Sequence, residues 1–563
     1  MRNVLQVCCL AVLSAASINM VGQASQPPTV AQAAAANAGR SSSASQTSSS
    51  QASVPDQGES QKSLGDIAKE RRAKKRVEIK VTEKDAKELF SSMDEILDFA
   101  SQDTGFIKHS SVKHQLVSQD DVTRHARESM SDSAEAQRMA RSELVLKKLG
   151  YLPPEFNLKT YLVSAVGESV AGYYEFKSKT MNLLNWVGLE QQRPIMAHEL
   201  THALQDQNYD LMTWESRPRR QMAAVSMRAD STEGEGTSAR RAVIEGQAMV
   251  VYVDYLLKPY GRTLGDTPSA MEFVKDRMAE SYDTSFVIKN APLLFKESAM
   301  FPYREGLVFE LALLKKGGNK LAFADAFAHP PADTHEVMEP AAYLAGEKAP
   351  AVNIPDLKVM LAGNYEPYDT GGMGQLDARI MTQQFGTEND RDSITPSWNG
   401  GAYVAVKRVG AKEPLTTADV ALLYLSRWKT PEAAQRFVEV YKKSLSKRVT
   451  VNDEKPWQPA CPPGTAKCSP SWAVRINTSE GPVFMEMGQN NAVLIAHSFD
   501  EGTAALLRQA VLLRAPAGKT TAAANYAGSG DLSLRLQEMP LFQAFQAELG
   551  RELLTAISDL DLR

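Results

Sequence analysis

The sequence has few cysteines, few histidines and almost no net charge, and each shortage narrows what the protein can be. Its 563 residues include four cysteines and eight histidines. Lysine plus arginine number 63 and aspartate plus glutamate 67, which leaves a formal net charge of -4. A nucleic-acid-binding protein needs a basic footprint, so we expect no nucleic acid partner. The length predicts two or more folded domains.

An apolar run near the N-terminus is too short to span a membrane. It extends from Val4 to Ile18, follows Arg2 and precedes small residues. A spanning helix needs about 20 apolar residues, whereas this layout is typical of a secretory signal peptide. We therefore predict a signal peptide at residues 1–24, a secreted or periplasmic location, and no stable membrane insertion.

Cleavage of that peptide would leave only Cys461 and Cys468, in the segment PACPPGTAKCSP. Two cysteines are too few for a Cys-only metal site. Because they flank a Pro/Gly turn in an exported chain, we predict a disulfide between them. Two unrelated thiols are the alternative.

Composition divides the remaining chain into three segments. Residues 25–80 are rich in Ala, Ser and Gln and end in the basic run KERRAKKR, which predicts a disordered linker. Helical spacing of apolar residues predicts that folded structure begins near Thr82. The Pro-rich segment HPPADTHEVMEPAAYLAGEKAP predicts a domain boundary near residue 350. We expect an α+β protein with domains at 81–350 and 351–563, the second one smaller, although residues 82–149 could instead be a prosegment that blocks the first domain sterically.

Periodicity predicts the main elements of both domains. In the first, ESVAGYYEFKSKTMNLLN reads as two strands joined by a polar turn, and PIMAHELTHALQDQ as a helix with Pro194 in its first turn. Two more helices are expected in SARRAVIEGQAMVVYVDYLLK and EGLVFELALLKKGG. In the second, ALLYLSRWKTPEAAQRFVEVYKKSL predicts a strand and a helix, and GPVFMEMGQNNAVLIAHSFDEGTAALLRQAVL a strand pair and a helix.

The most specific pattern is His198-Glu199-Leu200-Thr201-His202. On a helix it places two imidazoles one turn apart, so that both can reach one metal ion, with Glu199 beside them. A catalytic zinc site needs three protein ligands and an open position for water. We predict one Zn²⁺ ion held by His198 and His202, with Glu199 as the general base.

The third ligand has to come from elsewhere in the fold. Glu245 lies about forty residues downstream in a predicted helix, followed by the small residues Gly246 and Ala248, which allow close helix packing. We predict that Glu245 is this ligand. The alternative is a glutamate on the surface of the helix, and Glu233 and Glu235 are poorer candidates because they lie in the preceding Gly-rich loop.

The motif with a glutamate from a later helix resembles the gluzincin branch of the zincin metallopeptidases, of which thermolysin is a member. In order, GYYEFKSKTMNLL, AHELTHALQDQ, VIEGQAMVV, FPYREG and HPPADTHEVMEPAAYL are similar to a group of secreted, largely uncharacterised bacterial proteins. The weaker elements MGQLDARIM, WNGGAY and WKTPEAAQRF extend the resemblance, which covers roughly residues 120 to 510. It implies a zincin-like domain, followed by the α+β C-terminal domain, in a peptidase that acts on proteins or peptides.

Two departures limit the resemblance. Thermolysin-like enzymes carry an acidic residue four positions after the ligand glutamate, where this chain has Met249, so Asp206 or Asp254 is the expected partner of the histidines. The narrower group is also expected to have a histidine at the positions where this chain has Met338-Glu339-Pro340, so this chain lacks that histidine.

A zincin normally needs a hydrogen-bond donor for the transition state. The sequence offers Tyr303, Arg304, Tyr252 and His335 without choosing among them. Tyr173 and Tyr174 are expected near the substrate, or else in the core, because in zincins the strand just before the metal helix binds the substrate backbone. Two other functions stay open: a catalytically silent zincin-fold binding or scaffolding protein of the cell envelope, and a zinc amidase with a non-protein substrate.

Overall fold

The computed structural model describes residues 81–118, 121, 133–161, 172–185, 189–215, 227, 229–230, 234–267, 270–272, 274, 290–459 and 470–513. The predicted signal peptide at 1–24, the linker at 25–80 and the pair Cys461 and Cys468 lie outside these residues. The described residues combine many helices with three sheets, which confirms the α+β class. They belong to one compact unit, so the boundary near residue 350 stays a prediction.

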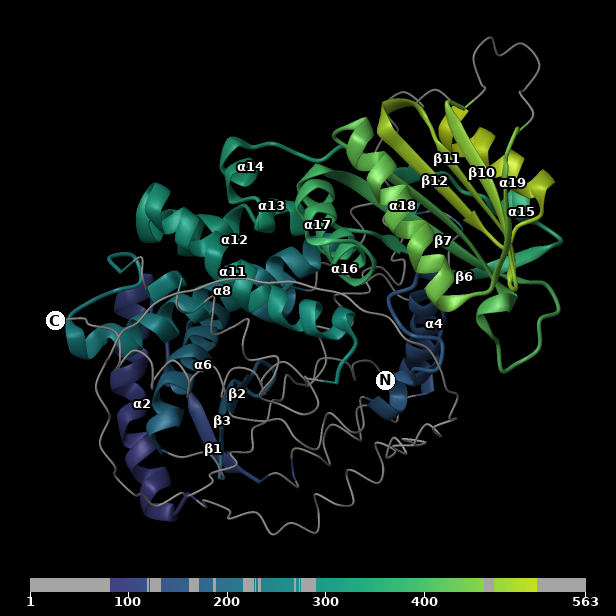
Figure 1. Cartoon of the computed structure of the whole chain (residues 1–563). Coiled ribbons are helices and arrows are strands. Elements are labelled where there is room, and N and C mark those ends of the chain that lie inside the picture. The colour runs from purple at the N-terminus through teal and green to yellow at the C-terminus, as the bar shows by residue number, and fades with distance from the viewer. Residues whose placement is uncertain are drawn as a thin grey trace, which may run out of the picture. The chain divides into compact units, whose positions relative to one another are not determined.

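The N-terminal part combines a three-stranded sheet with long helices (Figure 1). The strand order is β1-β3-β2, with β1 parallel to β3 and β2 antiparallel to it, so β2 is an edge strand. The two strands and polar turn predicted in ESVAGYYEFKSKTMNLLN are confirmed. The elements are α2 (Glu83–Thr104), β1 (Lys113–Val117), α4 (Ser133–Leu149), β2 (Gly172–Glu175), β3 (Thr180–Leu184), α6 (Leu189–Tyr209), α7 (Leu211–Glu215), α8 (Glu235–Leu257) and α11 (Leu293–Asn319).

Helix α2 is part of the core of this region. Its first turn is closed by a capping box between Thr82 and Asp85, in which each side chain bonds the backbone of the other. Leu89 and Leu97 are fully buried in the same cluster as the apolar side chains of α6 and α8, and Phe90 and Phe99 are partly buried against it. Helix α2 therefore packs in one core with α6 and α8.

Helix α6 begins earlier than its sequence predicts. The predicted helix has Pro194 in its first turn, but α6 starts at Leu189, so the proline lies inside it. Helix α11 is likewise longer than predicted and contains the FPYREG segment. The sequence prediction places Pro194 in a first turn because proline is tolerated there, and it begins the later helix at Glu305; in the structure both helices start earlier and contain a proline, Pro194 and Pro302.

Helices α8 and α11 cross with their backbones in close contact. A Cβ atom added to Gly246 would collide with the backbone of Gly306, and one added to Gly306 would collide with the carbonyl oxygen of Ala242. Only glycine therefore fits on either side of this crossing. The prediction that small residues after Glu245 permit close helix packing is confirmed, and the crossing fixes Glu245 next to α11.

The C-terminal part is built on a seven-stranded antiparallel sheet with the order β6-β7-β8-β12-β11-β10-β9. Its elements are β6 (Tyr365–Gly372), β7 (Trp398–Arg408), β8 (Val420–Trp428), α18 (Pro431–Arg448), β9 (Val451–Pro456), β10 (Trp472–Thr478), β11 (Gly481–Met487), β12 (Ala492–His497) and α19 (Glu501–Arg508). Alternate residues point to opposite faces, as period 2 requires: Leu422 and Tyr424 of β8 face the main core with α18, while Leu423 and Leu425 face a second cluster that includes α19. The strand and helix patterns predicted here are confirmed by β8 with α18 and by β11, β12 and α19.

The remaining elements are short helices and strands. No helix among the described ranges is both long and apolar enough to span a membrane. The other elements are β4 (Ala229–Asp230), α12 (Ala326–Ala328), α13 (Thr334–Met338), α14 (Pro340–Ala345), β5 (Asn353–Ile354), α15 (Lys358–Leu361), α16 (Gln375–Phe385) and α17 (Glu388–Ile394).

Candidate metal centre

The two histidines of the motif face the same point from one side of α6. His198 and His202 are one helical turn apart, and their Nε2 atoms lie 3.0 Å from each other. The ring planes are nearly perpendicular, at 89°. Each ring therefore presents its Nε2 atom to a shared position.

Glu245 of α8 completes this group. Its Oε2 atom lies 3.2 Å from Nε2 of His198 and 3.3 Å from Nε2 of His202. The three ligand atoms lie within 4.8 Å of one another, as the donors to one metal ion must. The structure thus brings together the three residues that the sequence predicts as ligands. Two imidazoles and one carboxylate are a donor set that catalytic zinc sites use, so the residues present fit a zinc ion.

Gln205 decides which nitrogen of His202 faces Glu245. The Nε2 atom of Gln205 donates to the carbonyl of Ile244 and to Oε1 of Gln247, both at 3.0 Å, which orients its amide. Its Oε1 atom, an acceptor, lies 2.9 Å from Nδ1 of His202. Nδ1 must therefore carry a proton and donate it. The lone pair of neutral His202 is then on Nε2 and points at the Glu245 carboxylate, where only a cation or a proton makes the contact favourable.

Gln205 is the contact that sequence reasoning missed. The expectation that Asp206 or Asp254 orients His202 is wrong, because the partner is Gln205, one residue before Asp206. The signal was available, since residues three apart on a helix are neighbours. Gln247 continues the chain of contacts by donating to the carbonyls of Ala322 and Phe323.

The charges of the group depend on one another. Burial lowers the pKa of His198 to about 4, so this imidazole is neutral at pH 7. Burial also opposes a charge on His202, but the Glu245 carboxylate outweighs it and raises the pKa of His202 to about 9. Burial alone would raise the pKa of Glu245, yet the two histidines hold it well below its usual value. Glu245 is therefore ionised and attracts a positive charge to this position.

Glu199 lies beside the three ligands. Its Oε2 atom accepts a hydrogen bond from the backbone N–H of Tyr174 on the edge strand β2, at 3.0 Å. Burial raises the pKa of Glu199 to about 7, although the charge of His202 acts in the opposite direction. A carboxyl group with a pKa near neutrality can both accept and return a proton at pH 7.

A polar cluster ties the edge strand to α6. The hydroxyl of Tyr174 donates to Oδ2 of Asp206 at 2.9 Å, and Lys179 pairs with the same oxygen at 2.5 Å. The backbone N–H of Leu211 donates to the other oxygen, at 3.1 Å. Asp206 therefore holds β2 against α6. It does not orient the histidines. Tyr173 is partly buried on the same strand.

The four candidate donors lie in different surroundings. The ring of Tyr303 stacks on that of His198, with centroids 6.0 Å apart, and is fully buried. Arg304 instead forms ion pairs with Glu297 at 2.7 Å and with Glu305 at 3.0 Å. The imidazole of His335 contacts Gln375 and the ring of Trp398.

Tyr252, the fourth candidate, lies seven residues after Glu245 on α8 and is buried. Its hydroxyl has no hydrogen-bond partner among the described residues. Of the four candidates, Tyr303 is the one seen in contact with a residue of the metal centre. Of the poorer ligand candidates, Glu233 lies outside the described residues, and the buried Glu235 accepts hydrogen bonds from Thr334.

Comparisons of the chain with protein-family models, with curated proteins and with solved structures found no match to any of them. Its function is therefore inferred from the site itself.

Proposed function

We propose that the chain is a zinc-dependent metallohydrolase that cleaves peptide bonds, in a zincin-like domain of the gluzincin type. The observation that carries this proposal is the convergence of two imidazole nitrogens and the Glu245 carboxylate beside an additional carboxyl group, that of Glu199. A site that only stabilises the fold has no use for the additional carboxyl. The predicted export would place the enzyme outside the cytoplasm.

The residues have distinct roles in this proposal. His198, His202 and Glu245 hold the ion, and Gln205 keeps His202 in the tautomer that binds it. A bound zinc ion would supply Lewis acidity and lower the pKa of a water molecule to about 7. Glu199 accepts the proton of the attacking water and returns it to the leaving amine. Tyr303, next to His198, is our candidate for a donor to the developing oxyanion.

The edge strand β2 is the proposed site for the substrate backbone. Among the described residues it pairs with β3 alone, and the Tyr174 N–H already contacts Glu199. An extended peptide can add to such an edge through backbone hydrogen bonds. This arrangement would bring a scissile bond to the carboxyl group that takes the proton.

A second candidate function is a catalytically silent zinc-binding protein. It is favoured by the burial of the centre, in which His198, Glu199, His202 and Glu245 are each between 1% and 5% exposed. A zinc amidase acting on a non-protein substrate would use the same residues.

The test is zinc content and casein hydrolysis of the mature protein beside a Glu199→Gln variant. The variant keeps the three ligands and loses the proton acceptor. Our proposal expects zinc in both proteins and activity in the wild type only. Zinc in both with activity in neither would favour the silent protein or the amidase, and absence of zinc from both would contradict every reading of the site.

A further inference from the structure

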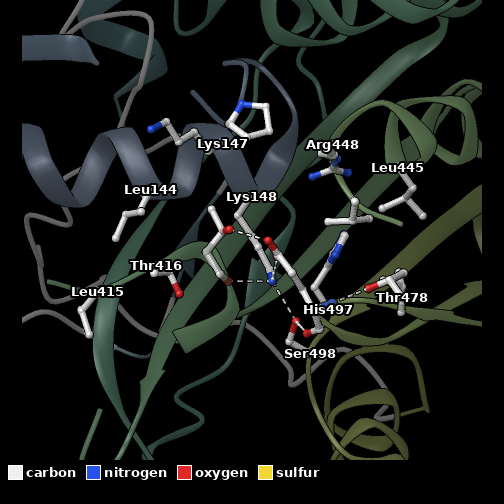
Figure 2. Close-up of a pocket in the computed structure, with 15 residues that line it drawn as sticks. Leu144, Lys147, Lys148, Leu415, Thr416, Leu445, Arg448, Thr478, His497 and Ser498 are labelled. Atoms are coloured by element: carbon white, nitrogen blue, oxygen red, sulfur yellow. Dashed lines mark hydrogen bonds and ion pairs between the residues drawn. The ribbon is translucent and has the colours of Figure 1, made fainter. Parts of the chain in front are cut away.

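A pocket of about 230 Å³ lies between α4 and the C-terminal sheet, and it shares no residue with the metal centre (Figure 2). Helix α4 supplies one wall, the end of α18 another, and residues around β10, β11 and β12 the base. Leu144, Leu415, Leu445, Val449 and Val483 form apolar parts of its lining. Lys147, Lys148 and Arg448 contribute three cationic side chains, against the single carboxylate of Glu480.

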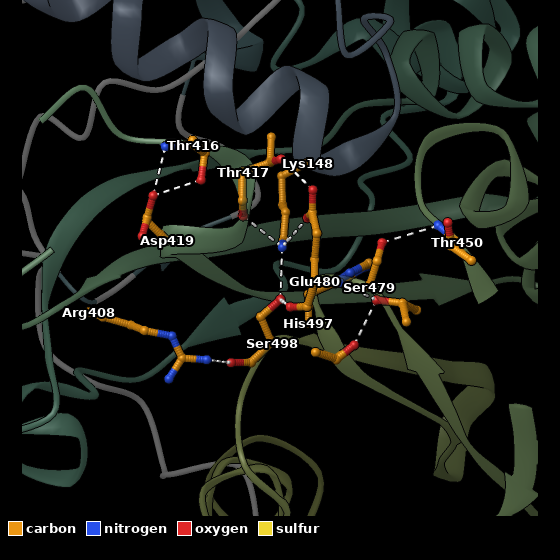
Figure 3. Close-up of polar contacts among 12 residues, drawn as sticks. Lys148, Arg408, Thr416, Thr417, Asp419, Thr450, Ser479, Glu480, His497 and Ser498 are labelled. Atoms are coloured by element: carbon orange, nitrogen blue, oxygen red, sulfur yellow. Dashed lines mark hydrogen bonds and ion pairs between the residues drawn. The ribbon is translucent and has the colours of Figure 1, made fainter. Parts of the chain in front are cut away.

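Lys148 is a fixed part of the base of this pocket. Its side chain is 2% exposed, and its ammonium group donates to the carbonyl of Thr417, to Oε2 of Glu480 and to Oγ of Ser498, each at 2.8 Å (Figure 3). Three donors thus meet three acceptors. Because all three of its N–H groups are engaged, the Lys148 ammonium group is available neither as a base nor to bind an anionic ligand. The Glu480 carboxylate neutralises its charge.

Ser498 is equally constrained. It has a positive φ of 61°, its Oγ donates to the carbonyl of Glu480 at 2.7 Å, and its own carbonyl accepts from Arg408 at 2.8 Å. A hydroxyl that already donates to a carbonyl and accepts from an ammonium group is not poised as a nucleophile. The polar base of the pocket is therefore built to bind rather than to react.

Of the three cationic side chains that line the pocket, Arg448 is the one without a carboxylate partner among the described residues. Lys147 pairs with Glu143 at 2.7 Å, as Lys148 does with Glu480. No carboxylate of the described residues forms an ion pair with Arg448, whose Nη2 atom donates to Oγ of Ser444 at 3.2 Å. Its Nε atom is buried against Gly150 without a hydrogen-bond partner among the described residues. Its guanidinium lies 5.2 Å from the centroid of the Tyr441 ring, which holds it in place.

We propose that this pocket binds a small aliphatic carboxylate, such as the C-terminal residue of a peptide with an apolar side chain. One unmatched positive charge selects a monoanion, and the planar guanidinium of Arg448 suits the two oxygens of a carboxylate. The leucine and valine side chains of the wall accept the aliphatic part. A volume of 230 Å³ lies below the range of about 300–1,000 Å³ that is usual for drug-sized ligands, which limits the occupant to a small molecule or one residue.

The test is calorimetric titration of the mature full-length protein with N-acetyl-L-leucine, with its neutral amide and with inorganic phosphate. It does not depend on zinc, so it can succeed or fail independently of the proposed peptidase activity. We expect saturable binding of the carboxylate only. Arg448→Gln should weaken this binding by about 10-fold or more, since it removes a charge-assisted hydrogen bond.

The matched control is Arg436→Gln, which removes a partly exposed arginine of the same helix α18 that is not part of the pocket lining. It should leave the affinity unchanged, and melting curves of both variants report whether they fold. Equal binding of the amide or of phosphate would overturn the ligand class. Absence of carboxylate binding to the wild type, or unchanged affinity in a folded Arg448→Gln protein, would overturn the site.

Discussion

The Nδ1 atom of His202 lies 2.9 Å from Oε1 of Gln205, whose amide is oriented by two further hydrogen bonds. This contact leaves Nε2 as the nitrogen that faces Glu245. It ties the tautomer of His202, a proposed metal ligand, to a neutral amide, whereas a metal-bound histidine often has a carboxylate as this partner.

Gln205→Leu should therefore weaken zinc binding. Loss of the Nδ1 partner frees the tautomer and the ring orientation, and changes of this kind cost about 10- to 100-fold in metal affinity. Competition with a chromogenic chelator measures the affinity. Gln207→Leu is the control, because Gln207 lies on the same helix and bonds the backbone of His109 and Ser110 instead. Equal affinities in the two variants would contradict the role of Gln205.

Gly306→Ala should destabilise the protein and disturb the metal centre together. Its Cβ atom would press on the backbone of Ala242, one turn before Glu245, and overpacking of this kind costs roughly 1–3 kcal/mol. The measurements are denaturant unfolding and zinc content.

Gly265→Ala is the control for this crossing, since its Cβ would meet only Oγ1 of Thr263, at the ordinary distance of 3.6 Å. It should change the free energy of unfolding by less than about 0.5 kcal/mol. If Gly306→Ala were equally harmless, the close crossing of α8 and α11 would be refuted.

Two buried carboxyl groups, Asp103 of α2 and Asp254 of α8, should make stability depend on pH. Burial raises the pKa of Asp103 to about 6, although a hydrogen bond with Asp254 lowers it. Burial and the charge of Asp103 raise the pKa of Asp254 to about 8. Between about pH 4, where both groups titrate in the unfolded chain, and pH 8 the folded protein holds more protons, so its stability falls as the pH rises.

Asp254→Asn removes one of these groups and should flatten that slope. Unfolding in urea between pH 5 and pH 8 measures it. Asp94→Asn, whose side chain is 72% exposed on α2, is the control and should keep the wild-type slope. A slope that Asp254→Asn leaves unaltered would show that the pair does not titrate in this window.

Lys148→Met should destabilise the protein far more than the same change at its neighbour. It removes three hydrogen bonds and leaves Glu480 without its cation, which for a largely buried pair costs about 3 kcal/mol. Lys147→Met breaks a single contact, the pair with Glu143 one helical turn away, and the other oxygen of Glu143 keeps its hydrogen bond from the Leu158 N–H, so this change should cost less. Similar costs for both substitutions, measured by urea unfolding, would contradict the docking of α4 on the C-terminal sheet through Lys148.

The spacing of apolar residues along a short segment predicted most of the helices and strands, because this spacing depends only on residues close together in the sequence. The pair His198 and His202 needs only helical spacing, and Glu245 was found from the small residues that follow it. Gln205 does not stand out in the sequence, because the usual partner of a metal-bound histidine is a carboxylate and Gln205 has a neutral amide. The start of α6 was misplaced because Pro194 was read as a first-turn residue.

Contacts between distant segments could not be predicted in the same way. Nothing near Lys148 in the sequence indicates Thr417, Glu480 or Ser498, which are up to 350 residues away. The sequence offers His335 as a hydrogen-bond donor for the transition state without indicating its neighbours, and the fold places its imidazole against Gln375 and Trp398. A side chain's type suggests its chemistry, but only the packed structure shows its partners.

The most direct test of the central claim is zinc stoichiometry, measured by elemental analysis after dialysis, of the wild-type protein and of Glu245→Leu. The account predicts about one zinc per wild-type chain and a large loss from the variant, since the site would keep only two of the three ligands a catalytic zinc needs. Glu235→Leu, at another buried glutamate of α8, controls for general damage to the helix and should retain zinc if it folds. A wild-type protein that binds no zinc, or a Glu245→Leu protein that binds it as tightly, would contradict the account.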